Sequence, residues 1–240
     1  MAELIGGSAL AGAGVGIVVL DTRHPLMRGN LQHAESFARP VSYEIVGISE
    51  PERLMAGDPS VAPLIVEAGE RLLRRGVGIV AGACGSFVYY QRAVAAALPV
   101  PVFLSVMMAV PMLLASLGPE RKLGVIASAR SAINDRSLAA CGVAEPGRLS
   151  VHELKGTGEF DRILAQEDRF DPDKLRREVV AVAGAAVRAD PRIGAFVIQC
   201  SDIPPFSRPI REATGRPCFD GAGLIDWLAA AALPPDHGAR

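Results

Sequence analysis

The sequence is poor in cysteine, in net charge and in uninterrupted apolar runs. Its 240 residues include four cysteines, and no two of them have the CxxC spacing that is typical of zinc sites and redox motifs. No cluster of Cys and His accompanies them, so the pattern argues against a metal finger or a disulfide scaffold, and we expect no metal site. Thiols that stay reduced suit a cytoplasmic protein, which is the localisation that we predict.

Neither sign of charge dominates. The sequence has 25 Lys and Arg and 26 Asp and Glu, which gives a formal net charge of −1. A nucleic-acid-binding protein would carry a basic face. A disordered chain would combine high net charge with low hydrophobicity, whereas 50% of these residues are hydrophobic. We therefore expect a folded protein that has no nucleic-acid partner.

No apolar run is long enough to cross a bilayer without interruption. The nearest candidate covers residues 98–118, where Pro99, Pro101 and Pro111 divide the run into a strand and a helix. The N-terminus is small and apolar, but its only early charge is Glu3, whereas a signal peptide begins with positive charge. We expect no membrane partner, and flexible tails at the N-terminus and at the C-terminal end.

Short apolar runs rich in Val and Ile alternate with stretches of helical pattern. The runs are continuous rather than alternating, which indicates strands that are covered on both faces, as in parallel sheets. The predicted strands cover residues 15–20, 42–48, 77–83, 101–105, 122–128, 149–154, 193–199 and 216–220. The predicted helices cover residues 60–76, 87–97, 171–190, 204–215 and 223–233. This alternation predicts an α/β fold.

The two halves of the sequence echo each other weakly. Each contains a strand, a helix, a strand and then a strand that ends at a cysteine, which suggests two similar α/β lobes that face each other. We place the change of lobe near residues 110–117. Residues 1–110 with 217–240 would form the first lobe and residues 111–216 the second, with the C-terminal helix folding back onto the first.

Cys84 and Cys200 both stand where a predicted buried strand ends. Ligands of parallel α/β sheets bind beyond the carboxyl ends of the strands. Each cysteine also precedes a predicted helix, whose dipole and free N–H groups favour a thiolate and a bound anion. We therefore expect the two thiols to have lowered pKa values and to face one pocket that binds a carboxylate.

Four segments carry a resemblance to a known family. They are "GIVVLDTRHP" at the start, "AGACGSF" around Cys84, "IQCSDIPP" around Cys200 and "IREATGRPCFDG" after it. Together they resemble the aspartate/glutamate/hydantoin racemase superfamily. The resemblance implies two Rossmann-like lobes with parallel sheets, related by a pseudo-twofold axis, with the active site between them. It also implies a homo-oligomer that works without a cofactor.

The same resemblance implies how the two cysteines act. One thiolate, Cys84 or Cys200, would remove a proton from a carbon next to a carboxylate or carbonyl, and the opposite thiol would return one to the other face. The predicted enzyme is an isomerase, a racemase or epimerase of an amino acid, a hydantoin or a related small carboxylic acid. Substrate-binding roles are expected for Thr22, Arg23, Gly85, Ser86, Ser128, Ser201 and Asp202.

Some alternatives remain open at this point. Ser86 and Ser128 also fit plain helix N-caps, and residues 21–24 fit an ordinary turn. Gly82 and Ala83 replace the Thr and Asn of the family motif, which puts free aspartate or glutamate in doubt as the substrate. A decarboxylase or cis–trans isomerase of a small dicarboxylate, or a binding protein without turnover, would use the same lobes.

The remaining sulfur-containing residues fit structural roles. Cys141 and Cys218 are expected to be small buried side chains, and Met107, Met108 and Met112 to fill the core.

Overall fold

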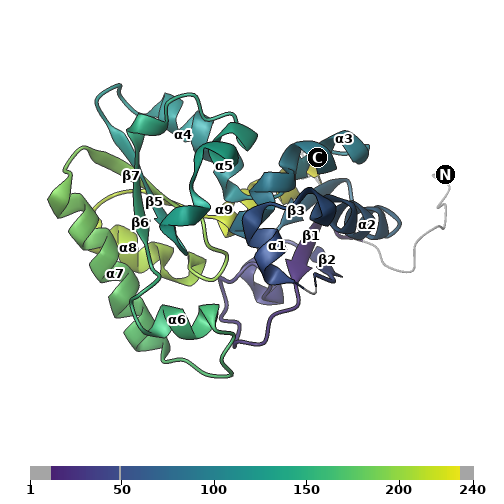
Figure 1. The fold of residues 1–240 in the computed structure, drawn as a ribbon, viewed down its shortest axis with the longest axis horizontal. Coiled ribbons are helices and arrows are strands. Elements are labelled where there is room, and N and C mark those ends of the chain that lie inside the picture. Colours follow the sequence, from purple (N-terminus) through teal and green to yellow (C-terminus); the bar gives the residue numbers. More distant parts are fainter. Residues whose placement is uncertain (1–11, 49, 233–240) are drawn as a thin grey trace, which may run out of the picture.

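The computed structural model describes residues 12–48 and 50–232, and in them eight strands form two four-stranded parallel sheets (Figure 1). All eight predicted strands are present, each within two residues of its predicted start. The flexible tails expected at the two ends fall largely on residues 1–11 and 233–240, outside the described residues. The α/β class is therefore confirmed, with helices flanking both sheets.

The first sheet has buried central strands, whereas its edge strand over residues 41–46 is only partly buried. Its strands are β1 (Val15–Leu20), β2 (Val41–Val46), β3 (Ile79–Gly82) and β4 (Val102–Phe103), in the order β2-β1-β3-β4. The central strands β1 and β3 have no exposed residue. A strand covered on both faces reads as a continuous apolar run, which is why this pattern identified them.

The second sheet repeats the topology of the first. Its strands are β5 (Lys122–Ala127), β6 (Leu149–Glu153), β7 (Ile193–Ile198) and β8 (Cys218–Phe219), in the order β6-β5-β7-β8. Each strand of this sheet therefore corresponds to the strand that lies four places earlier in the chain. The weak echo in the sequence is this structural repeat.

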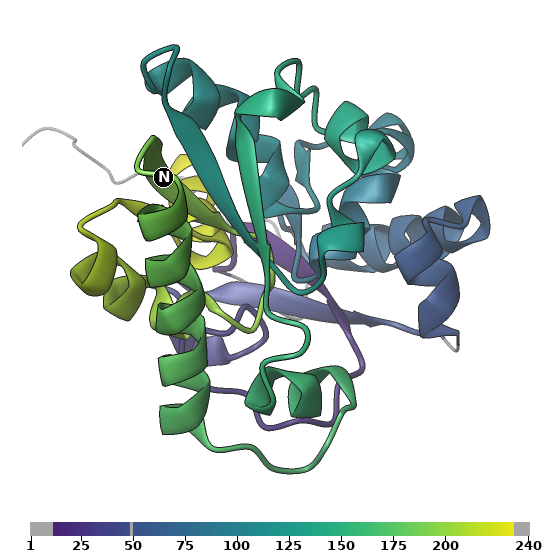
Figure 2. The ribbon, with the colours of Figure 1, turned by 60° about the vertical axis from the view of Figure 1, so that its left-hand side comes forward.

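Helices flank the two sheets. In the first lobe these are α1 (Pro51–Ala56), α2 (Ala62–Leu73) and α3 (Gln91–Ala97). In the second they are α5 (Asp135–Ala140), α6 (Glu159–Leu164), α7 (Pro172–Ala189) and α8 (Ser207–Thr214). Figure 2 shows α7 as the long helix along one side of the second sheet. Asp171 caps α7 by accepting the N–H groups of Asp173 and Lys174.

Two helices cross between the lobes. Helix α4 (Val110–Ser116) follows the first sheet in the chain, but Val110, Leu113 and Leu114 pack against β5 and β7 of the second sheet. Helix α9 (Gly221–Ala232) follows the second sheet, but its buried face packs against β1 and β3. The expected return of the C-terminal helix to the first lobe is thus present, and the exchange ties the two lobes together.

The limits of the lobes differ from the sequence estimate at one place. Strand β8 pairs with β7, so the second sheet extends to Phe219 and the change of lobe falls between β8 and α9 rather than at residue 217. The division into two lobes otherwise remains as proposed. One packing expectation is wrong: Met107 is buried, but the side chain of Met112 is 60% exposed on the outer face of α4.

None of the helices in the described part of the chain has both the length and the apolar character that a membrane crossing requires.

Candidate active site

The two cysteines occupy equivalent positions in the two lobes. Cys84 lies two residues after β3, and Cys200 lies two residues after β7, the strand that corresponds to β3 in the repeat. Cys84 is the N-cap of a short 3-10 helix over Gly85–Tyr90. After Cys200 the chain turns into a 3-10 helix at Pro204–Phe206 and then into α8. The topology therefore brings both thiols to the carboxyl edges of their sheets.

A single cavity of about 580 Å³ receives both thiols. Its wall comes from both lobes: the loop after β1, helix α1 and the loop after β3 on one side, and α6 with the loops after β5 and β7 on the other. A volume of this size is typical of a small-molecule site. The residues predicted for the site all lie on this wall, namely Thr22, Arg23, Cys84, Gly85, Ser86, Ser128, Cys200, Ser201 and Asp202.

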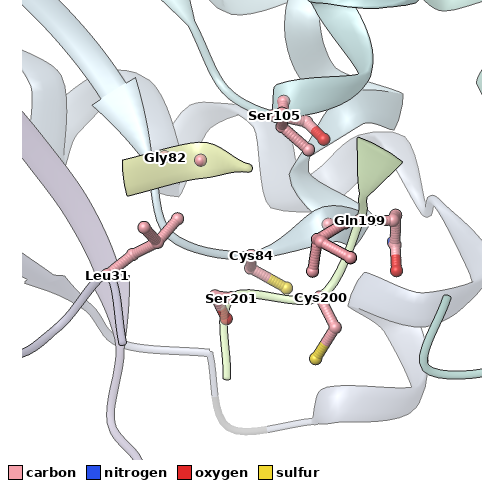
Figure 3. A pocket seen from close by; sticks show the side chains of 11 residues that line it. Leu31, Gly82, Cys84, Ser105, Gln199, Cys200 and Ser201 are labelled. Atoms are coloured by element: carbon pink, nitrogen blue, oxygen red, sulfur yellow. The ribbon is translucent and has the colours of Figure 1, made fainter. Parts of the chain in front are cut away.

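A second, much smaller pocket lies beside the same two cysteines. It has a volume of about 10 Å³ and includes Cys84, Cys200, Ser105 and Gln199 in its wall (Figure 3). This is close to the smallest space that holds one water molecule. Cys84 and Cys200 line both spaces, so the small pocket adjoins the large cavity at the two cysteine loops.

The environment of Cys84 opposes ionisation more than the sequence suggested. Burial raises the pKa of the Cys84 thiol to about 11, with a smaller contribution from the charge of Asp202. The backbone N–H groups of Ser86 and Phe87 act in the other direction and lower this pKa, as expected at the start of a helix. The predicted lowering is therefore wrong in its net direction, because desolvation outweighs the hydrogen-bond donors.

Cys200 is more deeply enclosed than Cys84. Its exposed fraction is 8%, and burial raises the pKa of its thiol well above the usual value for cysteine. The carboxylate of Asp202 raises it further, because a nearby negative charge disfavours a thiolate. The Sγ of Cys200 donates to Oδ2 of Asp202 at 3.5 Å. Here too the sequence-based expectation of a lowered pKa is wrong.

Asp202 is held by two residues of the opposite lobe. Its Oδ1 is 2.8 Å from Nε2 of His24 and accepts the side-chain N–H of Asn30 at 2.6 Å. His24 is 5% exposed, and although burial lowers its pKa most strongly, the hydrogen bond and charge of Asp202 produce a net rise. His24 and Asn30 were not among the predicted site residues. Only the fold brings the loop after β1 against Asp202.

Gly85 allows the two cysteine loops to approach each other. A Cβ atom on Gly85 would lie 1.9 Å from Nε2 of Gln199 and 2.8 Å from the Gln199 backbone oxygen. Any larger residue at this position would push the loop after β3 away from the loop after β7. Gln199 is itself buried, and its Oε1 accepts the backbone N–H of Ser128 at 3.4 Å. Sequence reasoning missed Gln199, which precedes Cys200 directly.

The helix-cap alternatives for the two serines are wrong. The 3-10 helix beyond Ser128 is capped by Ala129, and α5 by Asn134. Ser86 lies inside the 3-10 helix that Cys84 begins, and its hydroxyl donates to Sδ of Met55 at 3.1 Å. Both hydroxyl-bearing residues therefore line the cavity without capping a helix, and their substrate-binding roles stay predictions.

The loop after β1 is tied in place by amide side chains. The Gln32 side chain donates to the Leu20 carbonyl at 3.0 Å and to the Thr22 hydroxyl at 3.2 Å. The backbone N–H of Arg23 donates to Oε1 of Gln166 at 2.9 Å, across to the second lobe. Hydrogen bonds therefore hold both Thr22 and Arg23 in the wall, and Arg23 is exposed.

Within the described residues, no three His, Cys, Asp or Glu side chains gather in a way that would hold a metal ion.

Comparison with known proteins identifies relatives of two kinds. Residues 50–229 match the family model described as Asp/Glu/Hydantoin racemase. A dimethylsulfoniopropionate lyase from Durusdinium sp. clade D is 27% identical over 90% of this chain and 74% of its own length. Dimethylsulfoniopropionate lyase 6 from Emiliania huxleyi (strain CCMP1516) is 28% identical over 91% of this chain, which spans only 60% of that protein.

A solved structure shares the fold at low sequence identity. Unliganded arylmalonate decarboxylase superposes with a TM-score of 0.61 over 95% of each chain, at 18% identity. The family match covers most of the chain and includes both cysteine loops. This protein therefore belongs to the Asp/Glu/hydantoin racemase family.

Proposed function

We propose that this protein is an enzyme that moves protons at the carbon next to the carboxylate of a small substrate, with Cys84 and Cys200 as its acid/base pair. The observation that carries this proposal is the single cavity into which both thiols face, one from each lobe. Its volume of about 580 Å³ suits a small organic acid. The family match supports the same chemistry.

Inversion needs two groups, because one proton leaves from one face of the carbon and another must be added to the opposite face. One thiolate takes the α-proton, and the electron pair left behind is spread into the carboxylate. The opposite thiol then gives a proton to the other face, and the product is the mirror-image configuration at that carbon. A single base would exchange the proton on one face only.

The carbanion is the difficult species, because a carbon acid is far weaker than a thiol with a pKa of about 8.5. Fixed donors that face the developing charge lower this barrier. The cavity offers the N–H groups at the start of the Gly85–Tyr90 helix and the hydroxyls of Ser86, Ser128 and Ser201. Racemisation or epimerisation of an amino acid, a hydantoin or a related acid is the outcome that we expect first.

Elimination is a second candidate, and it is favoured by two observations. The curated relatives at 27% and 28% identity are named dimethylsulfoniopropionate lyases. The cavity wall also holds the carboxylates of Asp21, Glu52 and Asp202, which suit a substrate that carries a positive charge. A lyase acting on such a compound would remove the same α-proton. The electron pair would form the carbon–carbon double bond, and dimethyl sulfide would leave from the β-carbon with the electrons of the carbon–sulfur bond.

Incubation in heavy water distinguishes these outcomes. The test substrates are dimethylsulfoniopropionate, maleate, arylmalonates and a panel of single-enantiomer amino acids and hydantoins, and the products are followed by NMR and chiral chromatography. Racemisation would place deuterium at the α-carbon together with loss of optical purity, and elimination would give acrylate and dimethyl sulfide. Decarboxylation would release carbon dioxide, and cis–trans isomerisation of maleate would give fumarate. Binding without any of these changes would contradict the proposal.

A further inference from the structure

Asp202 has three side-chain hydrogen bonds, two at Oδ1 and one at Oδ2. Oδ1 faces Nε2 of His24 at 2.8 Å and Nδ2 of Asn30 at 2.6 Å, and Oδ2 accepts the Cys200 thiol at 3.5 Å. A carboxylate with this many donors has little capacity left for a ligand. A substrate carboxylate would also be repelled by it, so these hydrogen bonds point to a role for Asp202 besides contact with a substrate's positive charge.

The orientation of the His24 ring depends on Asp202. Nδ1 of His24 is buried and has no hydrogen-bond partner among the described residues, so Nε2 makes the defining contact. A hydrogen on Nε2 donates to the ionised carboxylate, which is the tautomer that the bond selects. Asn30 can only donate through its NH₂ group. Both partners therefore turn Oδ1 toward the first lobe and leave Oδ2 for Cys200.

We infer that His24 and Asn30 position Asp202 as the fixed acceptor of the Cys200 thiol, so that Cys200 rests as the proton donor and Cys84 as the base. This inference rests on the proposed function and adds to it a direction of proton flow. Asp202 is a positioning residue here, because it acts through Cys200 and not on the substrate.

The surroundings of Cys84 complete the asymmetry. Among the described residues no carboxylate oxygen accepts its thiol, whereas the N–H groups of Ser86 and Phe87 favour its ionised form. At Cys200 the backbone N–H of Asp202 lowers the pKa of the thiol, whereas the Asp202 side chain raises it. A thiolate on Cys84 would also disfavour a second one on Cys200. The first thiol to ionise is therefore Cys84.

The direction matters for the reaction. A substrate would lose the proton that faces Cys84, while Cys200 holds a proton ready for the opposite face. An elimination needs only this one direction. A racemase must have equal kcat/KM for the two enantiomers, so this resting state would show in the first turnover, which would be faster for the enantiomer whose α-proton faces Cys84.

Alkylation of the thiols in the absence of substrate tests the assignment. Iodoacetamide reacts with thiolates, so the rate at Cys200, followed by peptide mass spectrometry over a pH series, reports how firmly its proton is held. In Asp202→Asn the amide keeps the shape but removes the charge. We expect the pH profile of Cys200 to shift down by about one unit, which is about a tenfold faster reaction at a fixed pH on its rising limb.

Two further variants distinguish the effect of the Asp202 charge from a general loosening of the site. Asp21→Asn removes a carboxylate from the same cavity that is not bonded to Cys200, and His24→Gln leaves the Asp202 charge in place. We expect no acceleration of Cys200 alkylation in Asp21→Asn. In His24→Gln, which loosens Asp202 but keeps its charge, we expect a smaller acceleration than in Asp202→Asn. The remaining ionisable groups of the wall, Arg23, Glu52 and the Cys84 thiol, are unchanged in all three variants. Circular dichroism checks folding, and Asp202→Ser replaces Asp202→Asn if the latter does not fold.

The outcomes are distinct. An unchanged Cys200 profile in folded Asp202→Asn, or equal acceleration in His24→Gln, would overturn the inference. The profile is measured without turnover, so the proposed function is tested separately. If the profile shifts as expected but no substrate in the panel reacts, the proposed function fails and the hydrogen-bond assignment stands.

Discussion

At the scale of single residues, the reactivity of the site depends on how two buried thiols lose their protons. Cys84 has a pKa that burial raises to about 11 while neighbouring N–H groups lower it. Such a base is strong once formed, but little of it is present at neutral pH. A high pKa is useful for removing a proton from a carbon acid, because it brings the pKa of the base closer to that of the carbon acid.

The first prediction concerns pH. If Cys84 is the base, kcat/KM for α-proton exchange should rise about tenfold per pH unit from about pH 7 to 10, because the thiolate fraction grows in that proportion below the pKa. NMR of deuterium incorporation over a pH series measures this, with circular dichroism at each pH as the control for unfolding. A rate that is flat or falls across that range in folded protein would assign the base to another group.

At the scale of elements, the loops after β3 and β7 place the two thiols. They can do so because Gly85 has no side chain where Gln199 passes, with only 1.9 Å from the position of a Cβ to Nε2. The contact joins the start of the Gly85–Tyr90 helix to the end of β7, one element from each lobe. The geometry of the site is therefore fixed by a backbone contact as well as by the thiols.

The second prediction follows from this contact. Gly85→Ala should destabilise the protein by about 1–3 kcal/mol through overpacking. It should also lower kcat by about a hundredfold, because displacement of a catalytic group by about 1 Å has an effect of that size. Chemical denaturation and initial rates measure the two effects. Gly147→Ala is the matched control, since no atom lies within 4 Å of the added Cβ, and a similar loss there would contradict the explanation.

The third prediction concerns the helix that returns to the first lobe. Leu228 of α9 is buried against the first sheet, whereas Trp227 beside it is 59% exposed. Leu228→Ala should cost about 2–5 kcal/mol of unfolding free energy, as for a typical core leucine. Trp227→Ala should change it by about 0.5 kcal/mol or less. Urea denaturation of both variants is the measurement, and equal losses would show that α9 does not pack on the sheet as described.

The sequence predicted the strands and the cavity residues better than the burial and hydrogen-bond partners of the site side chains. The central strands β1, β3, β5 and β7 follow from continuous apolar runs, because strands buried on both faces carry that pattern, whereas the edge strands β2 and β6 are only partly buried. The nine predicted wall residues line one cavity, since parallel strands bring their carboxyl ends to one edge. The raised thiol pKa values were not predictable, because desolvation depends on packing from the other lobe. His24 and Asn30 were missed for the same reason: they meet Asp202 only across 172 to 178 residues of chain.

At the scale of the whole molecule, the site belongs to neither lobe alone. Each lobe supplies one thiol at the end of an equivalent strand, and the repeat of sheet order explains why the two approach from opposite sides. Bonds between the lobes hold this arrangement. Asn134 donates to the Tyr89 hydroxyl at 2.7 Å, Arg136 lies over the Tyr89 ring, and the Leu31 N–H donates to the Ser201 carbonyl at 3.3 Å.

The central claim is that two sulfur atoms on one cavity share the work of moving a proton, and the most direct test is deuterium transfer in single-cysteine variants. Any substrate of the panel that the wild-type protein converts in heavy water is compared in Cys84→Ser, Cys200→Ser and the control Cys218→Ser, a cysteine outside the cavity wall. We predict that Cys84→Ser lowers α-deuterium incorporation by at least about a hundredfold. Cys200→Ser should abolish inversion while retaining exchange on one face, and Cys218→Ser should match the wild type. Unchanged inversion and exchange in either of the first two variants would contradict the account.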